Sequence, residues 1–158
     1  MNTAQILSLL VRYGLVVLFF PASALDKTLN FNGAVKQARQ VFSSHTVAVA
    51  MIFAGLFVEL VMPLGILSGV ADRLAAFIMA GYCALTAILF KRFWAPGDFW
   101  APGDSKGRDL FWDFLKNLSL ASGFLLIVVG LDGHAWHGFV IHPLASSHPY
   151  GVAAAPPH

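Results

Sequence analysis

Four long apolar runs constrain what this chain can fold into more than any other feature of its sequence. A helix needs roughly 20 apolar residues to cross the ~30 Å hydrocarbon core of a membrane. Only 11% of the 158 residues are charged, whereas a soluble domain carries about 25%. We therefore predict an all-α fold, a bundle of four transmembrane helices at Ala4–Ala24, Thr46–Leu67, Leu74–Phe90 and about Phe114–Leu131. The last two runs are short for a span, so we expect them to extend into their flanks or to tilt little.

The segment between the first two runs has the pattern of a helix that lies in the membrane surface. Val35, Ala38, Val41 and Phe42 fall on one helical face, and basic and amide side chains fall largely on the other. We predict an interfacial helix within Leu25–His45. The pattern fits an ordinary amphipathic connector equally well, with no specificity for lipid.

Two features near the ends of the first and third runs need an interpretation. Ala22-Ser23-Ala24 resembles a signal-peptidase site, but Arg12 lies in the middle of the run rather than before it, which favours a retained helix over cleavage. After the third run, the hexapeptide Phe-Trp-Ala-Pro-Gly-Asp occurs twice in tandem, at residues 93–98 and 99–104. Pro-Gly occupies the central positions of a type II turn. Trp94 and Trp100 are typical of the lipid headgroup layer, with the edge of a cofactor or lipid site as the alternative.

Lysine and arginine predict the orientation in the membrane, because cytoplasmic loops carry an excess of them. The two long loops hold seven such residues, and the opposite side holds only Arg73. We expect both long loops in the cytoplasm and both termini on the other side. The net charge is only +2 and no basic stripe occurs, so no nucleic-acid partner is expected.

Arg12 and Glu59 are charges within apolar runs, where each costs about 2.5–3.5 kcal/mol on insertion scales. Counted from the centres of their runs at about 1.5 Å per residue, both lie roughly 3–4 Å outward of the midplane. The matched depth predicts an ion pair between them. Such a pair is expected either to fix the register of two helices or to form a proton-relay or headgroup site.

Five of the six histidines follow the fourth run, within a tail that we separate as residues 132–158 from a domain of residues 1–131. His134, His137 and His142 could supply three imidazoles to zinc or copper. Nearby glycines and a proline break any long helix here, and only Asp132 adds a further ligand. An interfacial hairpin or half-helix is therefore the competing interpretation.

Three blocks of sequence resemble the DoxX-like membrane proteins, within the wider DoxX and surfeit-4-like group. The first runs from Val11-Arg12-Tyr13-Gly14 to Lys27, although Ala24 stands where the family usually has glycine. The second holds Glu59, Gly65, Gly69 and Arg73, and the third is Lys116-Asn117-Leu118 through Gly123. The resemblance implies a four-helix protein of the bacterial inner membrane, and one branch is similar to subunits of thiosulfate:quinone oxidoreductase.

Three functions follow as hypotheses. The resemblance favours an accessory subunit or anchor of a redox system, in which a polar cluster of Arg12, Glu59, Lys27, Arg73 and Asn117 sets the polarity of a site for quinone. The alternatives are a catalytic quinone-linked subunit and a small transporter or metal-handling protein. A single cysteine, Cys83, and the lack of a nucleotide-binding loop favour a role beside a partner protein, or as a homo-oligomer, in the lipid bilayer.

Overall fold

The computed structural model describes residues 3–18, 20–130 and 135–150, and all regular structure in these residues is helical. Four helical stretches are long and apolar enough to cross a membrane: Gln5–Leu29, His45–Ser68, Asp72–Phe90 and Lys106–Val129. The predicted all-α fold with four candidate spans is confirmed. The fourth span begins eight residues before the predicted Phe114, which gives the short run its extra length.

The first span consists of two helices, α1 (Thr3–Val16) and α2 (Phe20–Leu29). Pro21 accounts for the interruption, because its ring has no N–H and crowds the carbonyl group four residues earlier, that of Val17. The last hydrogen bond of the first segment runs from the Val17 N–H to the Tyr13 carbonyl. The predicted end at Ala24 was therefore wrong, because the span continues to Leu29 and its centre moves accordingly.

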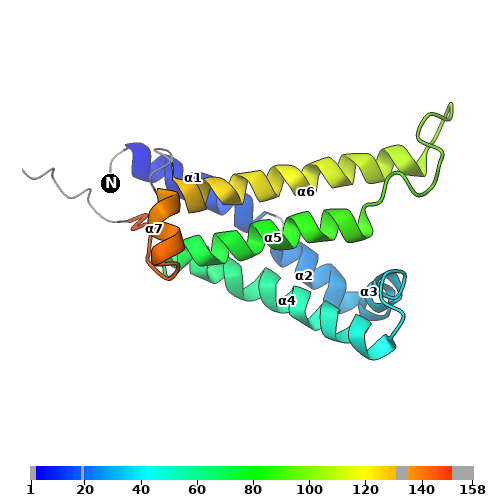
Figure 1. Ribbon diagram of the computed structural model, residues 1–158, viewed down its shortest axis with the longest axis horizontal. Coiled ribbons are helices and arrows are strands. Elements are labelled where there is room, and N and C mark those ends of the chain that lie inside the picture. Colours follow the sequence, from blue (N-terminus) through cyan, green and yellow to red (C-terminus); the bar gives the residue numbers. More distant parts are fainter. Residues whose placement is uncertain (1–2, 19, 131–134, 151–158) are drawn as a thin grey trace, which may run out of the picture.

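A short amphipathic helix, α3 (Phe31–Ala38), follows within the segment for which we predicted an interfacial helix. Its Val35 and Ala38 are buried against Ala48 and Ile52 of α4 (His45–Ser68). Figure 1 shows α3 at one end of the bundle, turned out of the line of α2 and α4. The apolar face predicted from the sequence is thus the face that packs.

The remaining long helices, α5 (Asp72–Phe90) and α6 (Lys106–Val129), lie side by side along most of their length (Figure 1). Helix α5 is central, because it packs on α4 as well as on α6. Small residues make this close packing easy, and those buried on α5 are Ala75, Ala76, Ala80, Cys83 and Ala87. Large apolar side chains are exposed on the outer faces of all four spans, as membrane lipid requires.

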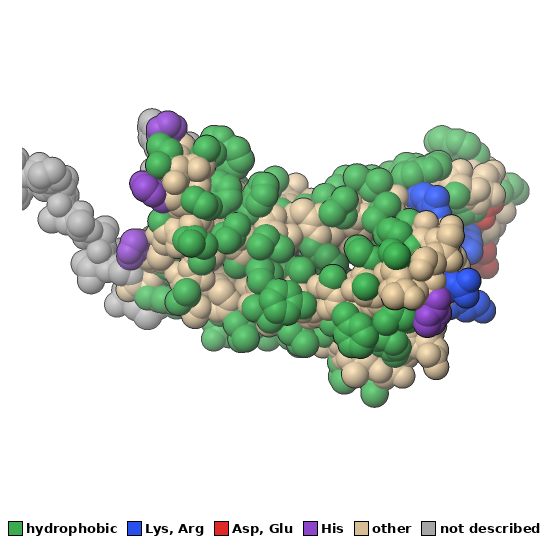
Figure 2. Space-filling view, turned by 60° about the horizontal axis from the view of Figure 1, so that its bottom comes forward, with side chains coloured by type: hydrophobic (Ala, Val, Ile, Leu, Met, Phe, Trp, Pro, Cys, Tyr) green, Lys and Arg blue, Asp and Glu red, His purple; other side chains and the backbone are tan. Residues whose placement is uncertain are grey.

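The two ends of the bundle differ in charge. One end, called here the basic end, holds α3 and the loop of residues 91–105, and lysine and arginine side chains gather there (Figure 2). The opposite end, called here the tail end, holds the turn between α4 and α5 and helix α7 (Ala135–Ile141). Phe139 of α7 is buried and its ring lies 5.4 Å from that of Phe77. The described part of the tail therefore packs on the bundle.

The two copies of the tandem hexapeptide form the loop before α6. Gly97 and Gly103 both have positive φ angles, of 75° and 80°, as a type II turn requires at its third residue. Phe93 and Phe99 pack against Phe111 of α6. Their tryptophan neighbours are more exposed: Trp94 is 54% exposed, with its ring edge-on to that of Phe114, and Trp100 is 90% exposed.

The aspartates of the two copies have different environments. Asp98 accepts hydrogen bonds from the backbone N–H groups of Gly107 (2.9 Å) and Lys106 (2.8 Å), which begin α6. These bonds, chiefly that from Gly107, hold the pKa of Asp98 below its ordinary value of 3.8. Asp104 is exposed and has no hydrogen bond or ion pair to another described residue. Asp98 thus satisfies helix donors that would otherwise have no partner.

We predict that Asp98→Asn loosens the start of α6, whereas Asp104→Asn, which removes the same charge one hexapeptide later, does not. Asparagine offers a single neutral acceptor to two N–H groups, so the Lys106 and Gly107 amides should exchange faster with deuterium. In the native chain their protection should hold above pH 3.8 and fall as the pH drops through the lowered pKa of Asp98. Equal exchange in the two variants would contradict the assignment.

Candidate functional site

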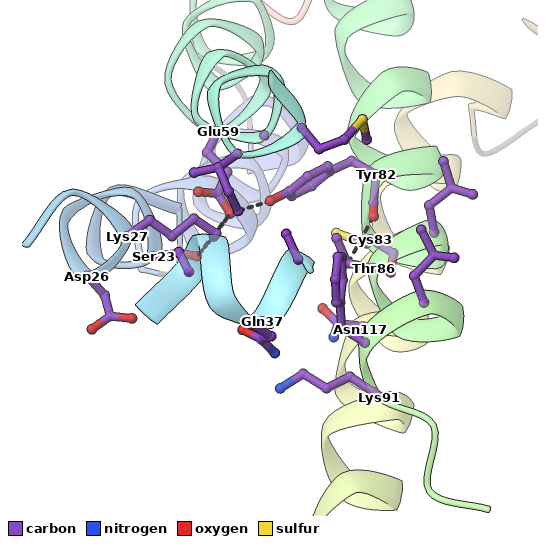
Figure 3. A pocket seen from close by; sticks show the side chains of 18 of the residues that line it. Ser23, Asp26, Lys27, Gln37, Glu59, Tyr82, Cys83, Thr86, Lys91 and Asn117 are labelled. Atoms are coloured by element: carbon purple, nitrogen blue, oxygen red, sulfur yellow. Dashed lines mark hydrogen bonds and ion pairs between the residues drawn. The ribbon is translucent and has the colours of Figure 1, made fainter. Parts of the chain in front are cut away.

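Glu59 of α4 is the centre of a buried polar cluster (Figure 3). Its Oε1 accepts hydrogen bonds from Lys27 Nζ (2.7 Å), Ser23 Oγ (2.9 Å) and the Tyr82 hydroxyl (2.9 Å). Lys27 Nζ also donates to Ser23 Oγ at 2.8 Å. Ser23 and Lys27 are four residues apart on α2, so they present their side chains on one helical face. The cluster therefore joins three helices, α2, α4 and α5.

A glycine makes room for the Tyr82 hydroxyl beside Glu59. Gly55 lies one helical turn before Glu59 on the same helix, and a Cβ atom there would lie 3.2 Å from the Tyr82 hydroxyl oxygen. That separation is tighter than an ordinary van der Waals contact, so a side chain at this position would displace the phenol. Gly55 is thus part of the site even though it has no polar group of its own.

The second carboxylate oxygen, Glu59 Oε2, is buried and has no hydrogen-bond partner among the described residues. Glu59 as a whole is only 2% exposed. A buried polar atom without a partner costs free energy and is rare in folded proteins. One oxygen of this carboxylate is therefore held by three donors, and the other is closed off from solvent without a hydrogen-bond partner among the described residues.

Glu59 lines a cavity of about 410 Å³, a size typical of sites for small organic molecules. The cavity extends from Glu59 and Tyr82 toward Gln37 and Lys91 (Figure 3). It lies between α2, α3 and α4 on one side and α5 and α6 on the other. Much of its wall is apolar, formed by Phe20, Met51, Ile52, Leu85, Leu89 and Phe90.

A second buried cluster lies toward the tail end and is centred on Arg12 of α1. Its guanidinium donates to Asp72 Oδ2 (2.8 Å), to the Ile66 carbonyl (3.0 Å) and to Ser147 Oγ (2.8 Å). Asp72 Oδ1 in turn accepts the Ser147 backbone N–H at 2.9 Å. Both oxygens of Asp72 have partners, in contrast to Glu59. This cluster has the features of a structural clamp between α1, α4, α5 and the tail.

The predicted ion pair between Arg12 and Glu59 is therefore wrong. Arg12 pairs with Asp72, and Glu59 pairs with Lys27. The depth estimate placed the centre of the first span near Gly14, but the span reaches Leu29. Arg12 consequently lies level with Ile66, seven residues beyond Glu59 on α4 and thus about 10 Å along the helix axis.

The other residues of the predicted polar cluster are divided between the two sites. Lys27 belongs to the Glu59 cluster, and Asn117 of α6 lines the same cavity. Arg73 follows Asp72 at the tail end, where its Nη1 lies close to Gly138 and its buried Nε has no hydrogen-bond partner among the described residues. Trp94 and Trp100 are exposed at the basic end and are not among the residues that line the cavity.

The histidine cluster predicted in the tail lies partly outside the described residues, because His134 is not among them. His137 and His142 are both exposed. Within residues 3–18, 20–130 and 135–150, no three histidine, cysteine or acidic side chains are close enough together to hold a metal ion. A three-histidine metal site thus stays a prediction.

A family model described as DoxX matches residues 7–92, more than half of the chain. The chain belongs to the DoxX family. The match includes both buried ion pairs of this DoxX protein, whereas α6 and the tail lie beyond it. No curated protein and no solved structure shows a significant match. The multi-pass membrane architecture is therefore supported by the family and by the four apolar helices together.

Sequence analysis missed four residues whose side chains form the two clusters: Ser23, Asp72, Tyr82 and Ser147. Asp72 and Ser23 carried a usable signal. Asp72 is an acidic residue at the start of an apolar run, and Ser23 precedes Lys27 by one helical turn. Tyr82 and Ser147 carried none, because a tyrosine inside an apolar run is an ordinary residue of a buried helix face and a serine in the tail has no distinguishing pattern.

We predict that Asp72→Asn destabilises this DoxX protein far more than Asp113→Asn does. Removing one partner of a buried ion pair costs about 3–5 kcal/mol, and the Asp72 side chain is fully buried beside Arg12. Asp113 pairs with Lys91 at 2.9 Å but is 41% exposed, which limits its contribution to about 0–1 kcal/mol. Unfolding in detergent measures both losses, and similar losses would contradict a clamp at Asp72.

Proposed function

We propose that this DoxX protein is a membrane subunit of a redox system that binds a quinone-class ligand in the cavity beside Glu59. One observation carries the proposal. A buried carboxylate has one oxygen held by three donors and the other without a partner, on the wall of a largely apolar cavity about 410 Å³ in volume. An apolar ring with a polar substituent fits such a wall, and the resemblance to quinone-linked subunits points to the same class.

The position of the cavity supports a ligand that arrives through the membrane. Its walls come from all the membrane-spanning helices except α1, and they are lined by Phe20, Ile52 and Leu89 among others. Exposed side chains, those of Asp26 and Gln37, lie toward its basic end. A lipid-soluble head group can therefore place its ring among the apolar side chains and its polar atom at Glu59.

An accessory role, rather than a complete enzyme, follows from the chemistry of the side chains. A quinone exchanges electrons with a donor or acceptor, and the chain offers one cysteine as its only redox-active thiol. We assign the electron donor to a partner protein in the same membrane. Apolar side chains exposed along the spans give such a partner, or a second copy, a surface on which to pack.

The charge difference between the two ends supports an inner-membrane protein whose basic end faces the cytoplasm. Both termini would then lie on the periplasmic side, and the cavity would open toward the cytoplasmic leaflet. We predict that an alkaline phosphatase fused after residue 150 is active and that a green fluorescent protein at the same site is not. The opposite pattern would reverse the orientation.

The function is tested by isolating the tagged chain from native membranes in mild detergent and identifying bound proteins and lipid-soluble compounds by mass spectrometry. We expect a redox protein and a quinone to copurify. Gly55→Leu, which fills the cavity beside Tyr82, should abolish the quinone while leaving the chain in the membrane.

Gly81→Leu is the matched control, because a Cβ atom at Gly81 meets no atom within 4 Å. This variant should retain the quinone at the native level. Loss of the quinone in both variants, or its absence from the native preparation, would contradict the proposed site. Quinone turnover by the isolated chain would replace the accessory role with a catalytic one.

A further inference from the structure

We infer that a second cavity, between α3 and the start of α4, binds the headgroup of an anionic phospholipid. It has a volume of about 280 Å³ and shares no lining residue with the cavity beside Glu59. Sites for whole small molecules begin at about 300 Å³, so this volume suits a headgroup rather than a complete lipid. The inference does not depend on the proposed quinone site.

The second cavity lies at the level where membrane-spanning helices end. The first span ends at Leu29 and the second begins at His45. The residues that line the cavity belong to α3, which lies between these two spans, and to the beginning of α4. Figure 1 shows α3 at the basic end, turned out of the line of α2 and α4. The cavity therefore meets lipid headgroups rather than the hydrocarbon core, whichever side of the membrane this end faces.

Three basic side chains line the second cavity, and no acidic side chain does. They are Lys36 and Arg39 of α3 and His45 of α4. No acidic residue occurs in the sequence between Asp26 and Glu59. The three basic side chains are exposed, and none has a hydrogen bond or ion pair to another described residue. Their hydrogen-bond donors are thus free for an anion from outside the chain.

The cavity beside Glu59 differs in charge, because each of its two lysines already has an acidic partner. Lys27 pairs with Glu59 at 2.7 Å, and Lys91 pairs with Asp113 at 2.9 Å. Only the cavity at α3 is therefore complementary in charge to an anion. Lysine and arginine are the side chains that most often bind phosphate oxygens, which favours a phosphate group as this anion.

An apolar path leads from the basic side chains toward the hydrocarbon core. Phe31, Val35 and Val49 form the apolar part of the cavity wall. Val49 and Phe53 follow His45 at intervals of four residues, so they lie on one face of α4 at increasing depth. The ring of Phe53 lies 5.4 Å from that of Phe31, and Phe53 is 59% exposed. The acyl chain of a bound lipid can pack on this face, whereas free phosphate has no chain to place there.

The experiment measures the lipid preference of the full chain in detergent by native mass spectrometry. Phosphatidylglycerol and phosphatidylcholine with the same acyl chains are titrated, and their apparent dissociation constants are compared. Each lysine or arginine beside an anionic lipid strengthens the attraction about fivefold. Lys36 and Arg39 together therefore predict a preference of roughly 25-fold for phosphatidylglycerol. In the double variant Lys36→Gln with Arg39→Gln, the preference should shrink to within about threefold.

The double variant Arg92→Gln with Lys106→Gln is the matched control. It removes the same charge from the same end of the bundle, at two exposed side chains that do not line the cavity. These side chains also have no hydrogen bond or ion pair to another described residue. The control should keep the native preference. All four substituted side chains are exposed, so both double variants should keep the native helix content, which circular dichroism checks.

The outcomes separate a lipid from other occupants of this cavity. Equal binding of the two lipids by the native chain, or an equal loss of preference in the two double variants, would overturn the inference. Displacement of phosphatidylglycerol by excess inorganic phosphate would assign the cavity to a free anion instead. A native dimer that is lost in the Lys36 and Arg39 variant, without a lipid preference, would assign it to a second copy of the chain.

Discussion

Charge buried between membrane-spanning helices is stable only beside an opposite charge, and this chain meets that requirement twice. Lys27 lies 2.7 Å from Glu59, and Arg12 lies 2.8 Å from Asp72. The first pair ties α2 to α4, and the second ties α1 to α5. These two pairs set the relative depths of α1, α2, α4 and α5, whereas α6 is held on α5 by close packing and, at the basic end, by the pair of Lys91 and Asp113. The cavity exists where the first pair holds α2 and α4 opposite α5 and α6.

The two buried carboxylates differ in how many of their oxygen atoms have hydrogen-bond partners. Asp72 has partners for both oxygens, including the hydroxyl and the backbone N–H of Ser147. Glu59 has three partners on one oxygen and none on the other among the described residues. A fold that needed only to neutralise charge would have no reason to leave Oε2 without a partner. Glu59 also lines the cavity, whereas Asp72 is not among the residues that line it, and the proposed quinone site is built on that difference.

The sequence predicted the features that depend on local pattern: the four spans, the amphipathic helix α3 and the positive φ angles of the two Pro-Gly turns. The prediction from sequence failed for the ion pair of Arg12, because that pairing depended on where the first span ends. An error of five residues at Leu29 was enough to pair Arg12 with the wrong carboxylate. Asp98 and Asp104 illustrate the same limit, because identical hexapeptides have different roles according to their distance from α6. To predict which residues of two helices are in contact, the depth of each helix in the membrane must be known. Apolar composition alone does not give that depth.

The separation of partners along the chain has a consequence for how the protein enters the membrane. Lys27 and Glu59 are 32 residues apart, Arg12 and Asp72 are 60 apart, and Ser147 lies 75 residues beyond Asp72. Because synthesis starts at the N-terminus, Glu59, the partner of Lys27, is made first. Asp72, the partner of Arg12, follows one helix later. Until α5 emerges, Arg12 carries an unneutralised cost of about 2.5–3.5 kcal/mol. The charge of Arg12 is thus neutralised only after α5 has been made, and Ser147 adds the last contact to this cluster.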